Sequence, residues 1–509
     1  MSVRALFGLW IVMVGLCGCE RRNFDRCRNP DFPCEEGRFC KVAAGETIGT
    51  CVVAECAVSS DCPSSRPNCN SAGRCYACTT VNDCTRTADT MFCDAGRCVE
   101  CRSPADCADP MKGVCDPQAR VCRSCAKHYD CDSVSGAGDG VCTKDETLAS
   151  LPNGQALRVG MCVPPSRVVV LENCSAGCSA QSKYNLLSPA QPYLRMKDAK
   201  ISATLNVTPI PGLPEIHIMS QDGDFAPSDP AGFGRPLPGF FGSNLGPALS
   251  VQDGVKLTLE GVLVKDAPIG LECKPSPNGT RIRLIRSTMA TNDTAIDSSD
   301  GCTLWIDQSF LGAAPRERYQ GLTNSGSVKQ LMTLDGTQFD FVNSVFHRNG
   351  SFGNFGGINI KTTSSSGRIV NCTFTEHAMA DSATGVHILN CLTPNTDVVV
   401  VNSLLINSAA PETPKTYIHK NCKGPIVYVG TNDKSIAGTG NVLDLTLDSV
   451  FVSPIFGSDL SLKPTAPESV RAGGLTEYLD PQGKNLIPSV DINGKKRSSK
   501  VSWGAFQAD

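Results

Sequence analysis

The sequence predicts a mostly β chain in which small disulfide-rich repeats precede a long β solenoid. Two observations support this fold class. Cysteine accounts for 29 of the 509 residues and is concentrated before residue 180, where it recurs at a regular spacing. After residue 180, short strand-like segments recur every 21 to 36 residues, separated by polar and glycine-rich turns. Such a period is typical of solenoids, in which each turn of chain stacks on the previous one.

Residues 1–18 have the pattern of a signal peptide. Arg4 supplies a short positive region, and the apolar run from Ala5 to Gly15 is too short for an ordinary transmembrane span. The next residues, 16–19, read LCGC and resemble the lipobox of bacterial lipoproteins. The resemblance implies cleavage just before Cys19 and attachment of a diacylglycerol to its thiol.

The alternative is an ordinary secretory signal with two chance cysteines, and in either case the chain leaves the cytosol. Palmitate labelling that is lost in Cys19→Ser would distinguish the two. Residues 19–26 are then a lipidated tether. Glu20 is not the Asp that resembles an inner-membrane retention signal, so we expect anchoring to the bacterial outer membrane or cell surface.

Charge and hydropathy limit the kinds of binding partner that the sequence predicts. The net charge of −3 predicts neither a nucleic-acid surface nor a polybasic membrane surface. Beyond the signal peptide there is no apolar run of 18 or more residues, so the lipid on Cys19 is the only membrane attachment that the sequence predicts.

Residues 27–165 are the predicted repeat region, with four cysteines per unit. Units begin at Cys56, Cys78, Cys101 and Cys125, at distances of 22, 23 and 24 residues, after a degenerate first unit. Units of this size cannot bury an adequate core, so disulfides are expected to stabilise them. Four cysteines allow three pairings, and the sequence does not choose among them. The disulfide candidates here are Cys56, Cys62, Cys69, Cys75, Cys78, Cys84, Cys93, Cys98, Cys101, Cys107, Cys115, Cys122, Cys125, Cys131, Cys142 and Cys162.

The C-x-x-C pairs, such as Cys75 and Cys78, are interpreted as joints between units. Haem attachment would need a following His, zinc would need reduced thiolates, and a thioredoxin-type site would need a βαβ context. We therefore expect no cofactor or metal in the repeats, which resemble cysteine-rich repeats of surface proteins from myxobacteria and related bacteria. An aspartate that recurs before the second cysteine is interpreted as a turn former rather than a calcium ligand; it is found at Asp61, Asp83, Asp106 and Asp130.

Residues 166–509 are the predicted solenoid. Six segments of similar pattern are 259–263, 285–289, 306–310, 342–346, 370–374 and 401–405. Each has apolar residues at its ends, and the alternation within it is that of a strand. The absence of intervening amphipathic helices argues against a doubly wound fold, and regular alternation at 8–12-residue spacing, which would favour a β-sandwich, is also missing.

Segments VNSVFHRNG (342–350) and VNCTFTEHA (370–378) resemble coils of right-handed parallel β-helix proteins of the pectin-lyase-like class. The region after 453 resembles the closing segment of bacterial surface β-helix proteins that are called choice-of-anchor Q proteins. Asp491, Gly494 and Arg497 match the family's D-x-x-G-x-x-R, and 504–506 match its terminal Gly-Ala-aromatic, whereas Gln507 replaces the usual acidic residue. The resemblance covers about 170–509 and implies a right-handed parallel β-helix.

The remaining cysteines have expected roles within this solenoid. Without the two in the signal region, 27 cysteines remain, an odd number, and Cys372 is expected to be a buried free thiol. Three further pairs are disulfide candidates, expected to close the N-terminal end, to bridge neighbouring coils and to join two loops; they are Cys174 with Cys178, Cys273 with Cys302, and Cys391 with Cys422.

This fold houses polysaccharide lyases and hydrolases, so an activity has to be inferred from individual residues. NTD at 395–397 matches part of one hydrolase motif, but that motif's paired Asp, Gly-His-Gly and Arg-Ile-Lys do not follow. The best acidic cluster contains Asp293, Asp297 and Asp300 and is interpreted as a solvated turn, with catalysis as the alternative. The histidines at 347, 377 and 387 are interpreted as surface or stacked side chains rather than metal ligands.

The sequence therefore predicts a surface lipoprotein with a non-catalytic adhesion role, or one that binds a glycan or a surface protein. The alternative is a surface-tethered polysaccharide lyase or glycoside hydrolase, which would bring several carboxylates or a basic residue together in one groove. The expected partners are the lipid bilayer, through Cys19, and a glycan or surface-protein ligand. No nucleic-acid partner is expected.

Overall fold

The computed structural model describes short stretches before residue 92 and most of the chain after it. The described residues are 26–27, 38–41, 49–53, 56, 58–63, 68–69, 74–76, 78, 84 and 92–508, without 108, 133–139, 144–157, 173–178, 198–199, 221–238, 243–245, 291, 313–329, 348–356, 376–386, 408–415, 437, 455–458 and 481–482. The predicted signal peptide, the lipidation of Cys19, and the pair Cys174 and Cys178 lie outside them.

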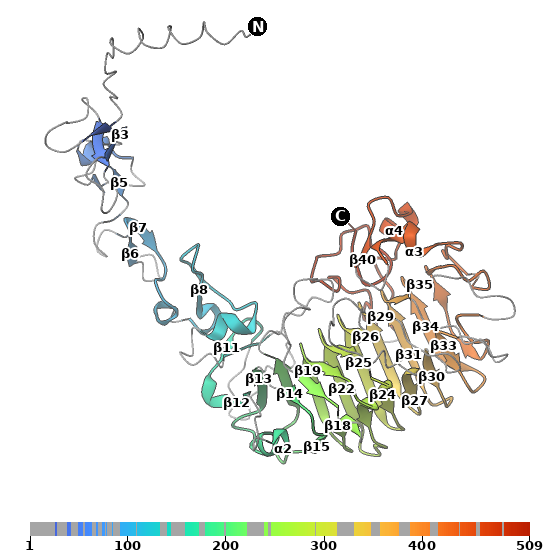
Figure 1. Ribbon diagram of the computed structural model, residues 1–509. Coiled ribbons are helices and arrows are strands. Elements are labelled where there is room, and N and C mark those ends of the chain that lie inside the picture. The colour runs from blue at the N-terminus through green and yellow to red at the C-terminus, as the bar shows by residue number, and fades with distance from the viewer. Residues whose placement is uncertain are drawn as a thin grey trace, which may run out of the picture. The chain divides into compact units, whose positions relative to one another are not determined.

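The chain forms two compact units, of which the first ends at Arg123 and the second begins at Ser124. The first unit is a series of small antiparallel sheets and 3-10 turns (Figure 1). Its elements are β1 (Arg26–Cys27), β2 (Arg38–Lys41), β3 (Gly49–Val53), η1 (Ser59–Asp61), β4 (Asn68–Cys69), β5 (Cys75–Tyr76), β6 (Phe92–Asp94), β7 (Arg97–Val99), η3 (Pro104–Asp106), η4 (Pro110–Lys112), β8 (Val114–Cys115) and β9 (Cys122–Arg123).

Disulfides stabilise every regular repeat with the same pairing, which confirms the predicted disulfide framework. The first cysteine of a unit bonds to the third, and the second bonds to the fourth. Of the three pairings that the sequence allows, the structure thus selects one for all four units. The bonds are Cys56–Cys69, Cys62–Cys75, Cys78–Cys93, Cys84–Cys98, Cys101–Cys115, Cys107–Cys122, Cys125–Cys142 and Cys131–Cys162.

The repeated aspartate caps the turn between the first two cysteines of a unit. Asp106 Oδ2 accepts hydrogen bonds from the N–H groups of Arg102 and Ser103 at 2.8 and 2.9 Å. Asp130 does the same for Ala126 and Lys127, at 2.8 and 2.9 Å. A carboxylate that accepts backbone N–H groups in this way fixes the turn, so its role in the described repeats is structural.

The fourth repeat belongs to the second compact unit, together with the solenoid. It contains η5 (His128–Cys131), β10 (Val141–Cys142) and β11 (Cys162–Val163), and η7 (Pro165–Arg167) follows. Arg195, on the first coils, is fully buried and donates to Asp132 Oδ1 at 2.7 Å and to the carbonyl of Gly140. The compact unit therefore begins earlier than the change in sequence character near residue 165.

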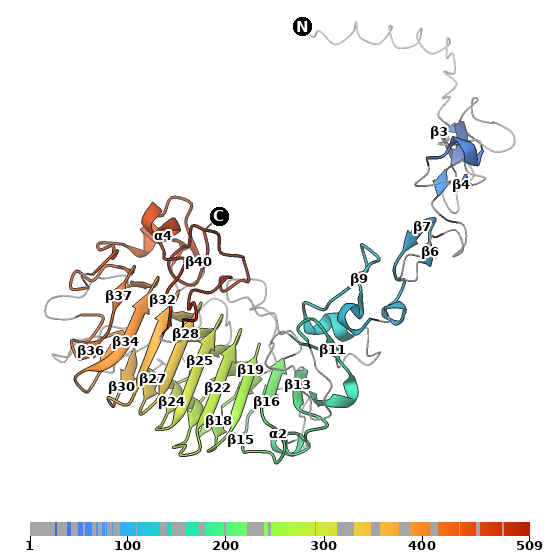
Figure 2. The ribbon, with the colours of Figure 1, turned by 180° about the vertical axis from the view of Figure 1, so that it is seen from behind.

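The solenoid consists of three parallel sheets, and between residues 193 and 406 the chain adds strands to sheets 1, 2 and 3 in rotation (Figure 1). Sheet 1, whose strands are in view in Figure 2, contains β12 (Val168–Glu172), β13 (Tyr193–Lys197), β16 (Ile216–Ser220), β19 (Lys256–Glu260), β22 (Thr280–Ile285), β25 (Cys302–Asp307), β28 (Gln338–Val342), β31 (Ser366–Val370), β34 (Thr396–Val401), β36 (Cys422–Lys423) and β37 (Ile426–Val427).

Sheets 2 and 3 complete each coil. Sheet 2 contains β14 (Lys200–Ile201), β17 (Gly239–Phe241), β20 (Leu263–Lys265), β23 (Thr288–Ala290), β26 (Phe310–Gly312), β29 (Val345–His347), β32 (Thr373–Thr375), β35 (Leu404–Ile406) and β38 (Gly430–Thr431). Sheet 3 contains β15 (Leu205–Val207), β18 (Pro247–Val251), β21 (Ile269–Cys273), β24 (Thr294–Ser298), β27 (Gln330–Leu334), β30 (Ile358–Ile360) and β33 (Leu389–Cys391). The predicted parallel β-helix is confirmed.

The core is a stack of like residues inside the coils. Because side chains alternate along a strand, every second residue points inward and meets its equivalent on the next coil. The rings of Phe346 and Phe374, in register on β29 and β32, stack with centroids 4.4 Å apart. At the first end, the short helix α2 (Ala180–Tyr184) covers the coils, and Tyr184 donates to the carbonyl of Thr208 at 2.5 Å.

The corner between sheets 1 and 2 explains the sequence motif that recurs in the solenoid. Each predicted segment contains the end of one strand, a corner and the start of the next strand, rather than one strand alone. The corner residue has a positive φ, which glycine and asparagine tolerate best. In chain order these residues are Gly261, Arg286, Gln308, Asn343, Asn371 and Asn402, with φ between 48° and 62°. The predicted register is therefore wrong by one residue for 259–263 and 306–310.

A hydroxyl ladder follows the corner, because the next residue is usually serine. Ser287 Oγ accepts from the N–H of Val262 at 3.2 Å, and Ser309 Oγ accepts from Ser287 at 3.1 Å. The ladder continues to Ser403, whose Oγ accepts from the N–H of Cys372 at 3.1 Å. Cys372 occupies a serine position in this ladder and is a buried free thiol, as the sequence predicts.

A C-terminal segment packs against the outer face of sheet 2. Several outward-facing side chains of this sheet, among them Phe310, Val345 and Leu404, are apolar and form one buried cluster with the segment. The segment contains α3 (Leu447–Val450), β39 (Phe451–Ser453), β40 (Asp459–Leu462) and α4 (Glu468–Ala472). This packing hides from water a sheet face that would otherwise be exposed.

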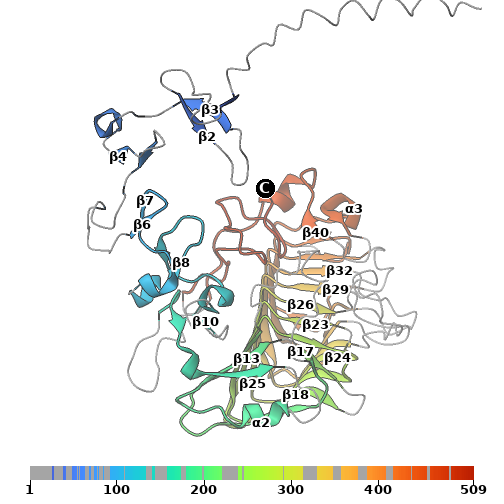
Figure 3. The same ribbon diagram turned by 60° about the vertical axis from the view of Figure 1, so that its left-hand side comes forward.

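Residues 474–508, which we call the tail, run beside the stacked strands (Figure 3). Side-chain amides of the corners donate to tail carbonyls: Gln308 to Asp491, Asn343 to Val490, Asn371 to Ser502 and Asn402 to Leu475, at 2.7 to 3.0 Å. The tail thus joins four consecutive coils. Among the described residues, no helix has the length and apolar character needed to cross a membrane.

Candidate functional site: the polar row of sheet 3

Sheet 3 carries a continuous row of polar side chains on its outer face, and we call it the polar row. The strand register places these residues beside one another on successive coils, which lie about 4.8 Å apart. The polar row consists of Asn206, Ser250, Glu272, Asp297, Thr333, Asn359 and Asn390. Inward-pointing neighbours on the same strands, such as Leu271 and Ile296, are fully buried in the core.

Hydrogen bonds link neighbouring members of the polar row. Ser250 Oγ donates to Glu272 Oε2 at 2.9 Å, and Lys274 Nζ lies 3.9 Å from the same carboxylate oxygen. Asn390 Nδ2 donates to Asn359 Oδ1 at 2.9 Å. The row therefore places donors and acceptors of fixed orientation at a regular spacing. Asn206 is exposed, and Glu272, Asp297 and Asn359 are half-buried, whereas the other three members are buried.

Asp297 lies in the middle of the polar row and is half-buried. Burial raises the pKa of its carboxyl group; Lys361 opposes the increase, and the carboxylates of Glu272 and Asp335 add to it. Two carboxyl groups on adjacent strands repel each other when both are charged, so one of them holds its proton more tightly. The environment of Asp297 thus disfavours its charged form.

The structure does not bring the three predicted aspartates together. Asp293 precedes β24 and Asp300 follows it, so the two lie beyond opposite ends of this strand. Asp300 lies instead against the backbone of Gly336, on the next coil. Only Asp297 belongs to the polar row. Sequence reasoning missed its neighbour Glu272, which stands 25 residues earlier and becomes adjacent only through the coil register.

The predicted histidines that the structure describes lie in different places. His347 is fully buried in sheet 2, with Nδ1 2.9 Å from Thr375 Oγ1. His387 precedes β33, near the end of the polar row, whereas His377 lies outside the described residues. The aspartate of the predicted NTD motif, Asp397, is on β34 of sheet 1 and has no place in the polar row.

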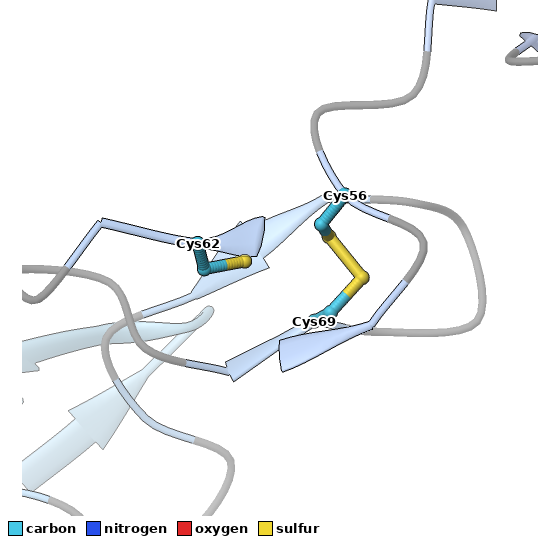
Figure 4. Close-up of side chains that lie close together, drawn as sticks. All are labelled: Cys56, Cys62 and Cys69. Carbon is cyan, nitrogen blue, oxygen red and sulfur yellow. A yellow bond between two sulfur atoms is a disulfide. The ribbon is translucent and has the colours of Figure 1, made fainter. Parts of the chain in front are cut away.

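Groups of three cysteines are the metal-like arrangements among the described residues. In the unit that Figure 4 shows, Cys56 and Cys69 form a disulfide, and Cys62, bonded to Cys75, lies beside them. The sulfur atoms of these three residues lie within 4.8 Å of one another. A disulfide sulfur is not a thiolate, so these groups cannot bind zinc while the repeats are oxidised.

Charged side chains also form a strip on the outer face of sheet 1, but residues of the tail contact them. Lys484 Nζ lies 5.1 Å from the ring centroid of Trp305, and Arg283 lies over the same ring at 5.3 Å. Arg368 forms two hydrogen bonds with Asp340, at 2.5 and 2.6 Å, and lies 3.5 Å from Asp480 of the tail. The contacts of this strip thus hold the C-terminal tail in place.

No protein-family model, curated protein or solved structure matches this chain.

Proposed function

We propose that this chain is a lipid-anchored protein of the bacterial cell surface that binds a polysaccharide along the polar row without cleaving it. The observation that carries the proposal is the in-register row of hydroxyl, amide and carboxylate groups on sheet 3. A polysaccharide is a chain of sugar units that each carry hydroxyl groups. Successive coils of the solenoid present hydrogen-bonding side chains at a regular spacing along its axis, so they can bind successive sugar units.

Export and anchoring are supported by other features. The lipobox-like sequence ending at Cys19 motivates the anchor, and the disulfide-rich repeats fit an oxidising compartment. In this proposal the repeats separate the solenoid from the bilayer. Metabolic labelling with palmitate tests the anchor: the wild-type chain is labelled, Cys19→Ser is not, and labelling that persists in the variant would contradict it.

Glycan binding is tested with the full chain on a glycan array, followed by titration calorimetry with the best ligand. Asp297→Ala and Asn359→Ala should each weaken binding about tenfold, because each removes one or two hydrogen bonds of roughly 1 kcal/mol. Gln338→Ala, an exposed change on sheet 1, is the matched control and should bind normally. Equal affinity in both polar-row variants and the wild type would refute the proposed surface.

Glycoside hydrolysis is the second candidate, and the adjacent carboxyl groups of Glu272 and Asp297 favour it. Retaining hydrolases hold two carboxyl groups about 5–5.5 Å apart, close to the spacing of neighbouring strands. Asp297, with its raised pKa, would protonate the leaving oxygen, and Glu272 would be the nucleophile. Release of reducing sugar by the wild type, abolished in Glu272→Gln, would establish this activity; a lack of turnover on every ligand that binds would exclude it.

A further inference from the structure

Two histidines lie together at the end of sheet 3, where no metal or ligand site was predicted. His387 precedes β33, and His419 lies in the next stretch of chain, which pairs with that strand through the bridge between Leu389 and Ile418. The centroids of the two imidazole rings are 4.7 Å apart, and the rings meet edge to face at 68°. Both side chains belong to the second compact unit and to one corner of the solenoid.

Backbone carbonyls fix the tautomer of both rings. His387 Nδ1 lies 2.6 Å from the carbonyl oxygen of Thr416, and His419 Nδ1 lies 2.9 Å from that of Cys391. The N–H of Asn421 is more distant from His419 Nδ1, at 3.4 Å. Since a carbonyl oxygen only accepts hydrogen bonds, each Nδ1 carries the proton, and the lone pair of each neutral ring is on Nε2.

This tautomer is the one that prepares a histidine for a metal ion. Histidine ligands usually donate their second ring N–H to a backbone carbonyl or a carboxylate, which orients the ring and makes the ligating nitrogen more basic. Both rings meet this condition, and no described residue forms a hydrogen bond with either Nε2 atom.

The separation of the rings also fits one shared ion. Two imidazoles bound through Nε2 at about 2.1 Å, with a bond angle between 90° and 110°, have centroids roughly 4.6–5.3 Å apart. The observed centroid distance of 4.7 Å lies near the lower end of this range.

Burial, hydrogen bonds and a disulfide define the surroundings of the pair. Burial lowers the pKa of His387; the bond to Thr416 opposes the decrease, His419 adds to it, and Asp433 opposes it. His387 is 8% exposed, whereas His419 is half-buried and gives the site access to solvent. The disulfide Cys391–Cys422 joins the two stretches of chain that carry the pair.

Asp433 lies near the pair and contributes negative charge, but it is not proposed as a metal ligand because both of its carboxylate oxygens already accept hydrogen bonds. Its Oδ2 accepts from the N–H of Tyr417 at 2.6 Å, and its Oδ1 accepts from the N–H and the hydroxyl of Ser435 at 2.8 and 2.7 Å. A carboxylate held by three donors is fixed in orientation, and its charge still favours a nearby cation.

We propose that His387 and His419 bind a divalent transition-metal ion through their Nε2 atoms. Imidazole nitrogens prefer Zn²⁺, Cu²⁺ and Ni²⁺ over Mg²⁺ and Ca²⁺, so the ion belongs to the first group. Water completes the coordination on the side that is open to solvent. The site joins the coil that carries Asn390, the last residue of the polar row, to the next coil, and it does not depend on glycan binding.

Calorimetric titration of zinc chloride into the full oxidised chain at pH 7.5, without glycan, tests the site. The expected result is saturable binding of one equivalent, together with a zinc-dependent increase in the thermal midpoint of unfolding. His387→Gln and His419→Gln should each weaken zinc binding about tenfold or more and remove the thermal shift. His217→Gln, which changes a histidine of sheet 1 beside Tyr193, is the matched control and should bind zinc normally.

Absence of saturable zinc binding, or unchanged affinity in both variants, would overturn the site. If His387→Gln does not fold because this ring is buried, His419→Gln still decides, because its ring is half-exposed and its loss disturbs the core less. Failure of the glycan array leaves this result unaffected, so the two proposals fail separately.

Discussion

Arg497 is the buried charge that organises the tail. Its guanidinium group donates to Asn343 Oδ1 at 2.8 Å, to the carbonyl of Gly504 at 3.1 Å and to that of Ser502 at 3.2 Å. Burial lowers its pKa to about 10, with Asp491 opposing the decrease, so the side chain remains charged at neutral pH. The arginine of the D-x-x-G-x-x-R match thus has a structural role, because it joins the tail to a corner of the solenoid.

Replacement of this arginine should destabilise the protein. Arg497→Met leaves three buried acceptors without their donor and should lower the free energy of unfolding by about 3–5 kcal/mol. Urea unfolding, followed by the fluorescence of buried Trp503, measures the change. Lys496→Met, at the exposed neighbouring position, is the control and should stay within about 0.5 kcal/mol of the wild type. A similar loss in both variants would contradict the role of Arg497.

Asp307 should make stability depend on pH. Burial raises the pKa of its carboxyl group to about 6, although Arg286 and Arg283 oppose the increase. The folded chain therefore holds this proton more tightly than the unfolded chain, so the contribution of this group destabilises the fold as pH rises through 6.

Asp307→Asn removes that contribution. The free energy of unfolding should rise by roughly 1–3 kcal/mol at pH 7.5 and change little at pH 4, where the wild-type carboxyl group is largely protonated in the folded state. Asp340→Asn, which breaks the paired hydrogen bonds to Arg368, should destabilise the protein at pH 7.5 instead. A stability gain at pH 4 equal to that at pH 7.5 would show that the charge of Asp307 is not the cause.

At the scale of the element, the corner between sheets 1 and 2 combines backbone conformation with a side-chain bond. Asn371 has a φ of 52° and donates through Nδ2 to the carbonyl of Ser502 at 3.0 Å. Asparagine tolerates this left-handed conformation, and its amide reaches the tail. The corner thus both turns the chain and binds the tail.

Two substitutions at Asn371 separate these contributions. Asn371→Gly keeps the conformation and loses the hydrogen bond, so it should cost about 1–2 kcal/mol; Asn371→Ala adds backbone strain and should cost about 1 kcal/mol more. Asn395→Gly, in an exposed turn with a φ of 64°, should be nearly neutral. Thermal unfolding compares the three. Equal losses for glycine and alanine at 371 would mean that the strain is unimportant.

The sequence predicts these elements well where the same residue pattern recurs. It predicts them poorly where the alignment of one coil on the next determines which residue lies at the corner. The VNS and VNC segments reveal the solenoid because three successive corners have asparagine at the same position. Other coils have Gly261 or Gln308 at this corner, so the sequence does not show that the predicted segments are offset there by one residue. Strand length and alternation alone cannot distinguish a strand from two short strands that flank a corner.

At the scale of the whole molecule, the fourth repeat is part of the solenoid body. His128 is fully buried, its Nδ1 accepts from the N–H of Cys142 at 3.0 Å, and its Nε2 lies 3.6 Å from Glu260 of sheet 1. Composition alone places the boundary near residue 165, because the cysteine-rich sequence ends there. Composition does not show which residues pack against the solenoid.

Two fragments test this boundary. A chain of residues 124–508 keeps the fourth repeat and should unfold in urea at the midpoint of the full chain's solenoid. A chain of residues 164–508 exposes the side chain of Arg195 and the face around it, and its free energy of unfolding should be lower by about 2–4 kcal/mol. Equal midpoints would show that the docked repeat contributes nothing to stability.

The candidate site could be predicted only in part, for the same reason. Asp297 stood out in the sequence as one member of an acidic cluster, but its relevant neighbour, Glu272, is one coil away rather than nearby in the chain. The pair of His387 and His419 is likewise separated by a whole coil. Coil lengths between successive corner residues range from 22 to 35 residues, which is too variable for adjacent side chains to be paired from spacing alone.

The tail has a consequence for the order in which this protein matures. Its hydrogen bonds reach corners as much as 183 residues earlier in the chain, at Gln308. Coils can stack while synthesis continues, since each coil contacts mainly its neighbours. Until the tail is made, however, the apolar outer face of sheet 2 and the corner amides have no cover. A partly synthesised chain would therefore expose these groups to chaperones and proteases, and docking of the tail removes the exposure.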